Sequence, residues 1–261
     1  MKKYKVCMTI AGSDPSGGAG IQADLKVFSV WKCYGQAVIT SLTVQNTQGV
    51  VYASSVSPQL VYDQIVAVFT DLKPDVVKIG MIPSVGVMRS IVKAIRQFAP
   101  NFVVLDPVMV STSGKRLMDE EVVDVLRTEL MPLCHLVTPN LPEAMLLVDK
   151  NTENQKELAK VLSDMIGGVA VLVKGGHAEG VPVDVLYADG CWHEFDNEVR
   201  VDTHNSHGTG CVLSSSIAAA VAQGAGLPEA VGRAKAFLTK ALRKGAVYEA
   251  GRGKGPLYLL P

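Results

Sequence analysis

The chain has 261 residues, of which 48% are hydrophobic and 19% are charged, and its 25 basic and 25 acidic residues balance. This length and composition predict a single α/β domain over residues 1–261 with a substantial core. The balanced charge gives no reason to expect a nucleic acid or an anionic membrane as partner, and no uncharged apolar run approaches the roughly 18 residues of a membrane span.

Short apolar runs alternate with longer stretches of helical spacing. Runs that are rich in β-branched residues and apolar on both faces are typical of strands in a covered parallel sheet. We expect such strands over residues 6–11, 37–44, 76–79, 102–105, 136–138 and 169–173. Two helices are expected between them, one with Leu60, Ile65, Val68, Phe69 and Leu72 on its apolar face and one with Val87, Ile91, Ile95 and Phe98. This order predicts a doubly wound sheet with helices on both faces.

The last third of the chain departs from this rhythm. Two short apolar runs flank Ala188-Asp189-Gly190, which predicts a hairpin and an antiparallel edge near residues 183–203. Two helices are expected to follow: one from about Thr209 to Gln223, and one that begins at Pro228.

Polar or glycine-rich segments follow the predicted strands. Open α/β sheets bind ligands beyond the carboxyl ends of their strands. Turns explain some of the glycines, but not a Gln, an Asp, an Asn, a Glu and a Lys in these places. The pattern therefore predicts one ligand crevice formed by residues 12–20, 45–47, 80–81, 106–109, 139–143 and 174–177.

The segment from His207 to Cys211 opens the first C-terminal helix with two glycines. Free amides at a helix start form an anion site, although a glycine-rich turn without a ligand has the same composition. This position is also expected to lower the pKa of the Cys211 thiol, unless the cysteine is buried and inert.

The glycine-rich N-terminal loop is not expected to bind a nucleotide. Gly12 and Gly17 have Walker A spacing, but Gly18 and Ala19 replace the lysine and the hydroxyl residue. We expect this loop to pack near a second substrate, with Asp24 one helical turn beyond Gly20.

Metal and phosphate ligands have competing interpretations. Asp106 and Glu143 supply the hard oxygens that Mg²⁺ prefers, or they cap helices. Lys174 contacts a phosphate, or its side chain extends to solvent from a strand edge. A zinc site at His204, His207 and Cys211, with Cys191 and His193 as further ligands, is the less favoured alternative because nothing shows that these residues converge. Five cysteines without a framework spacing favour reduced thiols in a cytoplasmic protein.

Seven segments, in order and over nearly the whole chain, resemble the hydroxymethylpyrimidine/phosphomethylpyrimidine kinases of the ribokinase-like superfamily. They are residues 14–26, 45–47, 78–81, 105–109, 138–144, 174–177 and 207–211. The resemblance implies a three-layer αβα fold with a central, mostly parallel sheet. It also implies two ATP-dependent phosphorylations, of 4-amino-5-hydroxymethyl-2-methylpyrimidine and then of its monophosphate, with Mg²⁺ as cofactor and a homodimer as assembly.

The same resemblance implies roles for individual residues. Gln45 is expected to bind the aminopyrimidine edge, in a pocket shaped by Gly12, Ala19, Asp24, Thr43, Met81 and Val108. Gly208, Thr209 and Gly210 are expected to hold the transferring phosphoryl group beside Lys174, and Cys211 to act on the attacking hydroxyl. ATP is expected to contact Asn140, Lys174, Thr209 and Gly210, with Mg²⁺ near Glu143 and Asp106. Cys211 departs from the aspartate of many ribokinase-like enzymes but matches this branch.

Two other functions stay open at this point. A pyridoxal or pyridoxine kinase acts on a similar ring, but its substrate offers a phenolic oxygen where Gln45 would pair with an amino group. A non-catalytic pyrimidine sensor would be expected to lack anion-site or metal residues, and none is missing. A redox thiol protein is disfavoured because no second cysteine has Cys-x-x-Cys spacing.

Overall fold

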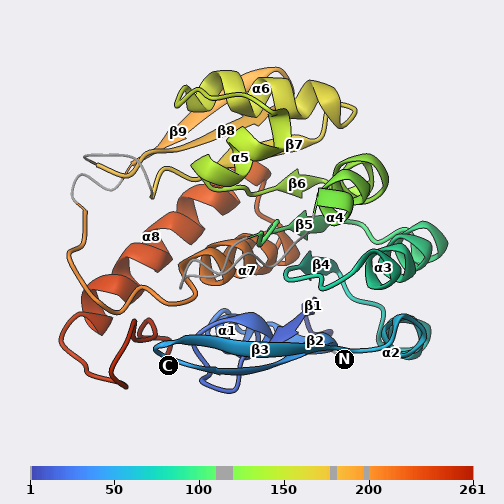
Figure 1. Cartoon of the computed structure of the whole chain (residues 1–261), viewed down its shortest axis with the longest axis horizontal. Helices are drawn as coiled ribbons and strands as arrows, with labels where there is room; N and C mark the ends of the chain where they lie inside the picture. Colours follow the sequence, from blue (N-terminus) through green and yellow to red (C-terminus); the bar gives the residue numbers. More distant parts are fainter. Residues whose placement is uncertain (1, 110–119, 177–180, 197–199, 261) are drawn as a thin grey trace.

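A nine-stranded sheet organises the computed structural model, which describes residues 2–109, 120–176, 181–196 and 200–260 (Figure 1). The strand order is β3-β2-β1-β4-β5-β6-β7-β8-β9, with parallel pairing from β2 through β1 and β4 to β7. The strands are β1 (Val6–Ser13), β2 (Tyr34–Asn46), β3 (Gly49–Ser55), β4 (Val76–Ile79), β5 (Val103–Leu105), β6 (Leu136–Val137), β7 (Ala170–Val173), β8 (Asp184–Ala188) and β9 (Cys191–Phe195). β8 and β9 form the predicted antiparallel edge.

Helices cover both faces of the sheet. One face carries α2 (Pro58–Leu72), α3 (Val85–Phe98), α4 (Glu120–Val125), α5 (Leu141–Val148) and α6 (Gln155–Met165), and the other carries α1 (Gly20–Val30), α7 (Thr209–Ala222) and α8 (Leu227–Gly245) (Figure 1). Val103 and Leu105 of β5 pack into the first layer, whereas Val104 packs into the second. Because successive strand side chains point to opposite faces, a strand covered on both sides is apolar throughout. The predicted three-layer αβα arrangement is confirmed.

A second antiparallel edge, at the opposite side of the sheet, was not predicted. β2 extends beyond the expected strand and returns as β3. Residues 51–55 of β3 are all exposed, including Val51 and Tyr52 at 66% and 57%. A strand with no buried face lacks the alternation that marks strands in a sequence.

The buried face of α2 differs from the expected one. Ile65 and Phe69 are buried together with Val61, whereas Leu60 and Leu72 are exposed. The helix begins at Pro58, after the Ser57 hydroxyl, which accepts a hydrogen bond from the Leu60 amide. Apolar residues occur on several sides of this helix, so helical spacing alone admitted more than one apolar face.

No helix in the described ranges is both long and apolar enough to cross a membrane.

Gly175, two residues after the end of β7, lies against the backbone that enters β8. A Cβ at Gly175 would lie 1.9 Å from the Val183 carbonyl oxygen, whereas a Cβ at Gly176 would have nothing within 4 Å. Gly175→Ala should therefore lower the free energy of unfolding by about 2 kcal/mol. The matched variant Gly176→Ala should change it by less than about 0.5 kcal/mol. Urea unfolding followed by circular dichroism measures both, and equal values for the two would contradict this packing.

Candidate active site

A cavity of about 850 Å³ lies beyond the carboxyl ends of the parallel strands, next to the start of α7. This size is within the range of small-molecule sites. Segments far apart in the chain meet there, so Gln45 and Gly210 line the same cavity. The predicted site residues that line it are Gly12, Ala19, Thr43, Gln45, Met81, Asp106, Val108, Asn140, Glu143, Lys174, Gly208, Thr209, Gly210 and Cys211. The structure brings these residues together, and their individual roles stay predictions.

The start of α7 presents backbone rather than side chains to the cavity. Gly208 precedes the helix with φ at +85°, and no side chain caps the first turn. A Cβ at Gly208 would lie 1.9 Å from the carbonyl oxygen of Gly18, so only glycine fits this contact. The uncapped amides, together with the positive end of the helix dipole, can hold an anion.

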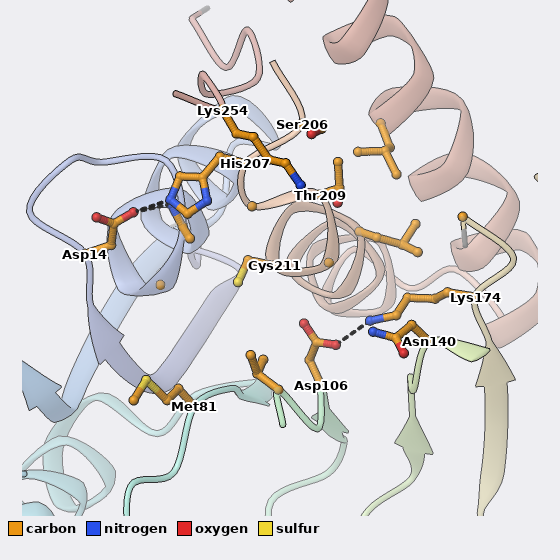
Figure 2. A pocket seen from close by; sticks show the side chains of 18 of the residues that line it. Asp14, Met81, Asp106, Asn140, Lys174, Ser206, His207, Thr209, Cys211 and Lys254 are labelled. Carbon is orange, nitrogen blue, oxygen red and sulfur yellow. Dashed lines mark hydrogen bonds and ion pairs between the residues drawn. The ribbon is translucent and has the colours of Figure 1, made fainter. Parts of the chain in front are cut away.

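Lys174 and Asp106 form an ion pair in the cavity wall. Lys174 Nζ lies 2.7 Å from Asp106 Oδ1, and the two side chains are 13% and 2% exposed. Burial opposes ionisation of Asp106, but the cations of Lys174 and Lys78 hold its pKa below the ordinary value. Lys174 is therefore directed at a carboxylate beside the cavity and does not extend to solvent (Figure 2).

Asn140 and Glu143 cap α5 and line the cavity at the same time. The Asn140 side chain accepts from the Glu143 amide at 2.9 Å, and Glu143 Oε2 accepts from the Asn140 amide at 2.8 Å. Burial raises the pKa of Glu143 to about 7; Lys174 opposes this rise and the Asp106 carboxylate adds to it. Glu143 therefore caps a helix, as one of the two alternatives predicted, and it also lies near the Asp106 carboxylate.

These oxygen groups fit Mg²⁺ by their chemistry. Glu143 Oε1 receives one long hydrogen bond, from the Met109 amide at 3.4 Å, and the Asp106 carboxylate lies near enough to raise the pKa of Glu143. A carboxyl group whose ionisation is disfavoured by a neighbouring carboxylate suits, together with that neighbour, a hard divalent cation. For zinc, no group of three or more His, Cys, Asp or Glu residues within the described part of the chain could hold a metal. The zinc alternative at His204, His207 and Cys211 is therefore not supported.

Cys211 lies between the Asp14–His207 pair and the Asp106–Lys174 pair (Figure 2). Burial raises the pKa of its thiol to about 11; the Lys78 cation opposes this rise, and the Asp24 and Asp106 carboxylates add to it. The expected lowering of this pKa by the helix start is wrong, because desolvation outweighs the helix field. Cys211 is a neutral thiol at neutral pH.

Asp24 does not line the cavity, contrary to expectation. It is fully buried, and its carboxylate lies 2.8 and 3.0 Å from Lys78 Nζ. The hydroxyls of Thr9 and Ser215 also donate to it, both at 2.6 Å. With its oxygens occupied in this way, Asp24 holds Lys78, which does line the cavity. The sequence feature that could have identified this pair is the position of Lys78 inside the apolar strand β4, because a buried cation needs a paired anion.

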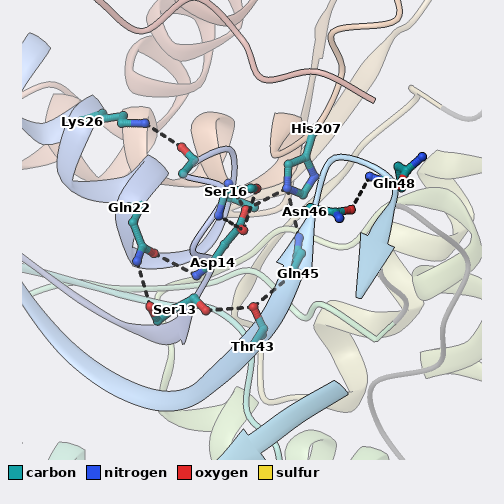
Figure 3. Close-up of polar contacts among 12 residues, drawn as sticks. Ser13, Asp14, Ser16, Gln22, Lys26, Thr43, Gln45, Asn46, Gln48 and His207 are labelled. Carbon is teal, nitrogen blue, oxygen red and sulfur yellow. Dashed lines mark hydrogen bonds and ion pairs between the residues drawn. The ribbon is translucent and has the colours of Figure 1, made fainter. Parts of the chain in front are cut away.

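A polar network at the N-terminal loop was not predicted. Asp14 Oδ2 lies 2.8 Å from His207 Nε2, which lies 3.1 Å from the side-chain nitrogen of Gln45 (Figure 3). Asp14 Oδ1 accepts from the Ser16 amide and hydroxyl at 2.9 and 2.7 Å. Asp-Pro-Ser is a turn signature in which the Asp side chain bonds the backbone two residues on. That signature predicts the turn but not the contact with His207.

The C-terminal segment also contributes to the site. A Cβ at Gly251 or Gly253 would overlap Thr47, so these glycines let the segment lie against the turn after β2. The His207 amide donates to the Gly255 carbonyl at 3.0 Å. Lys254 lines the cavity near Thr209 (Figure 2). Alternating glycines over residues 251–255 were the available signal. His177, part of a predicted segment, lies outside the described residues.

Comparisons of sequence agree on one family. A family model described as phosphomethylpyrimidine kinase matches residues 14–258. The chain is 44% identical over 256 residues to the hydroxymethylpyrimidine/phosphomethylpyrimidine kinase of Rhizobium meliloti, covering 97% of this chain and 96% of that protein. It is 43% identical over 253 residues to the thiamine biosynthesis bifunctional protein ThiED of Geobacter sulfurreducens. That match covers 96% of this chain but 51% of the bifunctional protein. The chain thus spans about half the length of that bifunctional relative.

Solved structures share the fold. The phosphomethylpyrimidine kinase of Clostridium difficile superposes with a TM-score of 0.80 at 39% identity, covering 90% of this chain and 98% of that one. An ADP complex of Bacillus subtilis pyridoxal kinase superposes with a TM-score of 0.87 at 32% identity, covering 98% and 97%.

Glu143 predicts a dependence of stability on pH. Because folding raises its pKa from 4.5 to about 7, its stabilising contribution is complete below about pH 4.5 and is lost as the pH rises to about 7. Glu143→Gln removes this titration. Relative to wild type, the variant should gain roughly 2–3 kcal/mol of unfolding free energy between about pH 5 and about pH 8.

Urea unfolding at a series of pH values measures this difference. Glu157→Gln is the matched control, because Glu157 occupies the same position in the first turn of α6 but is exposed. Glu157→Gln removes only an exposed ion pair with Lys150, so its offset from wild type should change far less between about pH 5 and about pH 8 than that of Glu143→Gln. A constant offset for Glu143→Gln would contradict the raised pKa.

Proposed function

This chain belongs to the phosphomethylpyrimidine kinase family, and we propose how its cavity performs the reaction of that family. It is an ATP-dependent phosphotransferase of the ribokinase-like fold. It phosphorylates 4-amino-5-hydroxymethyl-2-methylpyrimidine and then the resulting monophosphate, which gives the diphosphate used in thiamine biosynthesis. The observation that carries the proposal is the meeting of the uncapped start of α7 with Gln45 in one cavity.

Phosphoryl transfer requires alignment of the reacting groups and neutralisation of charge. The amides of Gly208, Thr209 and Gly210 would hold the transferring phosphoryl group, because no side chain occupies the start of α7. Lys174 would offset charge on the β and γ phosphates. Its present partner is Asp106 at 2.7 Å, so the ammonium is already directed into the cavity and charged.

We propose that Glu143 and Asp106, with Asn140 beside them, would hold a Mg²⁺ ion. The support is the pair of neighbouring carboxylates in the cavity wall and the raised pKa of Glu143. When bound, the ion supplies positive charge to the phosphate oxygens. Asn140 would also contact ATP together with Thr209 and Gly210, since all three line the same cavity.

Cys211 would position the attacking hydroxyl. Because its thiol is neutral near pH 7, it already carries a proton and is not a preformed base. It would accept the hydroxyl proton only late, as the new P–O bond forms, and only after its own thiol proton has passed to solvent. Lys78, whose cation opposes the rise in the pKa of the thiol, would stabilise the negative charge on the sulfur in that step.

The pyrimidine would lie against Gln45. The side walls would come from Gly12, Ala19, Thr43, Met81 and Val108, all of which line the cavity. An amide can pair with both the amino group and the ring nitrogen of an aminopyrimidine. Asp24, which lies behind this wall, would act only by holding Lys78.

We also propose a cytoplasmic location and a homodimer. All five cysteines are free thiols, which fits a reducing compartment. The β2–β3 hairpin exposes Leu42, Val44, Val51 and Tyr52, which is an apolar surface suited to a second copy of the chain.

Substrate preference tests the assignment against its nearest alternative, a pyridoxal kinase. The similarity to the Bacillus subtilis enzyme is the observation that favours this alternative. The kcat/KM for hydroxymethylpyrimidine should exceed that for pyridoxal by at least about tenfold, because pyridoxal has no amino group for Gln45. ADP release in a coupled assay measures both. A higher kcat/KM for pyridoxal would overturn the assignment, and binding of ATP and pyrimidine without ADP release would favour a sensor.

Replacement of Cys211 tests the mechanism. Cys211→Ala should lower kcat by about 100-fold or more, with little change in ATP affinity, because the thiol acts on the acceptor hydroxyl and not on the nucleotide. Cys191→Ala, at an exposed cysteine of β9, is the control and should leave kcat unchanged. An unchanged kcat for Cys211→Ala would remove the thiol from the mechanism.

A further inference from the structure

Asp14 is an ionised hydrogen-bond acceptor beside the cavity. Its side chain is 4% exposed. Burial opposes ionisation, but hydrogen bonds from His207 and Ser16 hold the pKa of Asp14 below its ordinary value. The Ala19 amide also donates to Asp14 Oδ2, at 2.9 Å. An ionised carboxylate accepts hydrogen bonds and donates none.

This carboxylate determines which ring nitrogen of His207 carries hydrogen. His207 Nε2 lies 2.8 Å from Asp14 Oδ2, so Nε2 must be the donor, whether the ring is neutral or charged. The ring cannot turn away easily. Its side chain is 8% exposed, and a Cβ at Gly18 would lie 2.4 Å from His207 Cδ2.

The direction of the Gln45 amide follows from this donor. The structure has the Gln45 side-chain nitrogen facing His207 Nε2 at 3.1 Å, but the nitrogen and oxygen of an amide occupy nearly equivalent positions. Because Nε2 carries hydrogen, that direction sets a donor against a donor, so the opposite direction is favoured, in which the amide oxygen shares the Nε2 hydrogen with Asp14 Oδ2. The amide nitrogen then faces Thr43 Oγ1 at 3.3 Å. Thr43 can accept there, since its own hydroxyl donates to the Ser13 carbonyl at 3.0 Å. Each contact of Gln45 with His207 and Thr43 then joins a donor to an acceptor, and Figure 3 shows these three side chains.

In this direction the Gln45 amide keeps one oxygen lone pair and one N–H for a ligand, because His207 and Thr43 engage the others. An aminopyrimidine edge presents an amino N–H next to a ring nitrogen that accepts, which matches this pair. If the Gln45 nitrogen took the place of its oxygen, it would face the amino group of the pyrimidine, donor against donor. We propose that His207, held by Asp14, is a positioning residue that fixes the direction of the Gln45 amide and thereby selects rings with an amino group beside a ring nitrogen.

The inference rests on the proposed role of Gln45 and deepens it. His207 directly precedes Gly208, so the residue that orients Gln45 also begins the turn that presents the phosphate-binding amides. The two functions are separable in kinetics. Loss of the oriented Gln45 amide should change the ratio of kcat/KM between acceptor rings. Disruption of the turn that presents the phosphate-binding amides should lower kcat for every acceptor alike.

The experiment compares hydroxymethylpyrimidine with the analogue that lacks its amino group. His207→Leu should lower kcat/KM about tenfold for hydroxymethylpyrimidine, mainly through KM, and change it less than about twofold for the analogue. Gln45→Ala should cause a similar loss of preference. The double variant should lose no more preference than Gln45→Ala, because both substitutions remove one shared interaction.

Controls separate positioning from damage to the fold. His204→Leu, at an exposed histidine of the same loop, should leave the preference unchanged, and thermal unfolding of each variant reports stability. If His207→Leu does not fold, Asp14→Asn takes its place. An Asn side chain can donate as well as accept, so the His207 proton is no longer fixed and the preference should fall several-fold. ¹⁵N NMR of labelled histidine should also show hydrogen on His207 Nε2 in the wild type.

The outcomes are distinct. Equal losses in kcat for both acceptors with the preference retained, or a His207 Nε2 without hydrogen, would show that His207 does not orient Gln45. If Gln45→Ala keeps the preference while the wild type phosphorylates hydroxymethylpyrimidine, the role of Gln45 is wrong and this inference falls, although the kinase activity stands. If the wild type phosphorylates neither ring, the proposed function itself fails.

Discussion

The contact between Gly208 and Gly18 fixes the geometry on which the site depends. Gly208 adopts a left-handed conformation whose Cβ position is already occupied by the Gly18 carbonyl oxygen. Two loops nearly two hundred residues apart in sequence therefore pack backbone to backbone, and α7 begins at the cavity wall. The uncapped amides of α7 face the cavity for this reason, and the His207 ring lies against the loop that carries Asp14. Any side chain at either glycine would separate the phosphate-binding turn from the ring-binding loop.

Ion pairs define the electrostatics around this contact. Lys78 with Asp24, Lys174 with Asp106, and Lys235 with Asp184 each place an ammonium within 2.8 Å of a carboxylate, and all three lysines line the cavity. Burial of these charges is tolerated because each has a partner and further hydrogen bonds. The cavity can therefore present cations to phosphates without leaving uncompensated charge when no ligand is bound. Desolvation keeps the half-buried Cys211 a neutral thiol; the Asp24 and Asp106 carboxylates add to this effect and the Lys78 cation opposes it.

Much of the site could be read from the order of residues along the chain, because parallel strands end at one edge of a sheet. Segments at the carboxyl ends of β1, β2, β4, β5, β6 and β7 were expected to converge, and residues from each of them line one cavity. The exposed strand β3 could not be found, since neither of its faces is buried. Asp24 was misplaced because a carboxylate one turn into a helix can point into a crevice or away from it, and only the fully buried Lys78 decides which.

The sequence alone determined the layered α/β fold, the strand-end loops and the glycine-rich start of α7, because these depend on local spacing and on chain direction. Only the tertiary structure decided which charges meet and how far each group is removed from water. Cys211 has the same neighbours in sequence whether its thiol is acidic or not, and burial raised its pKa. His207 and Asp14 are 193 residues apart, so their contact exists only after the first and penultimate helices have packed. Pairing and desolvation are properties of three-dimensional neighbours, and no spacing along a chain encodes them.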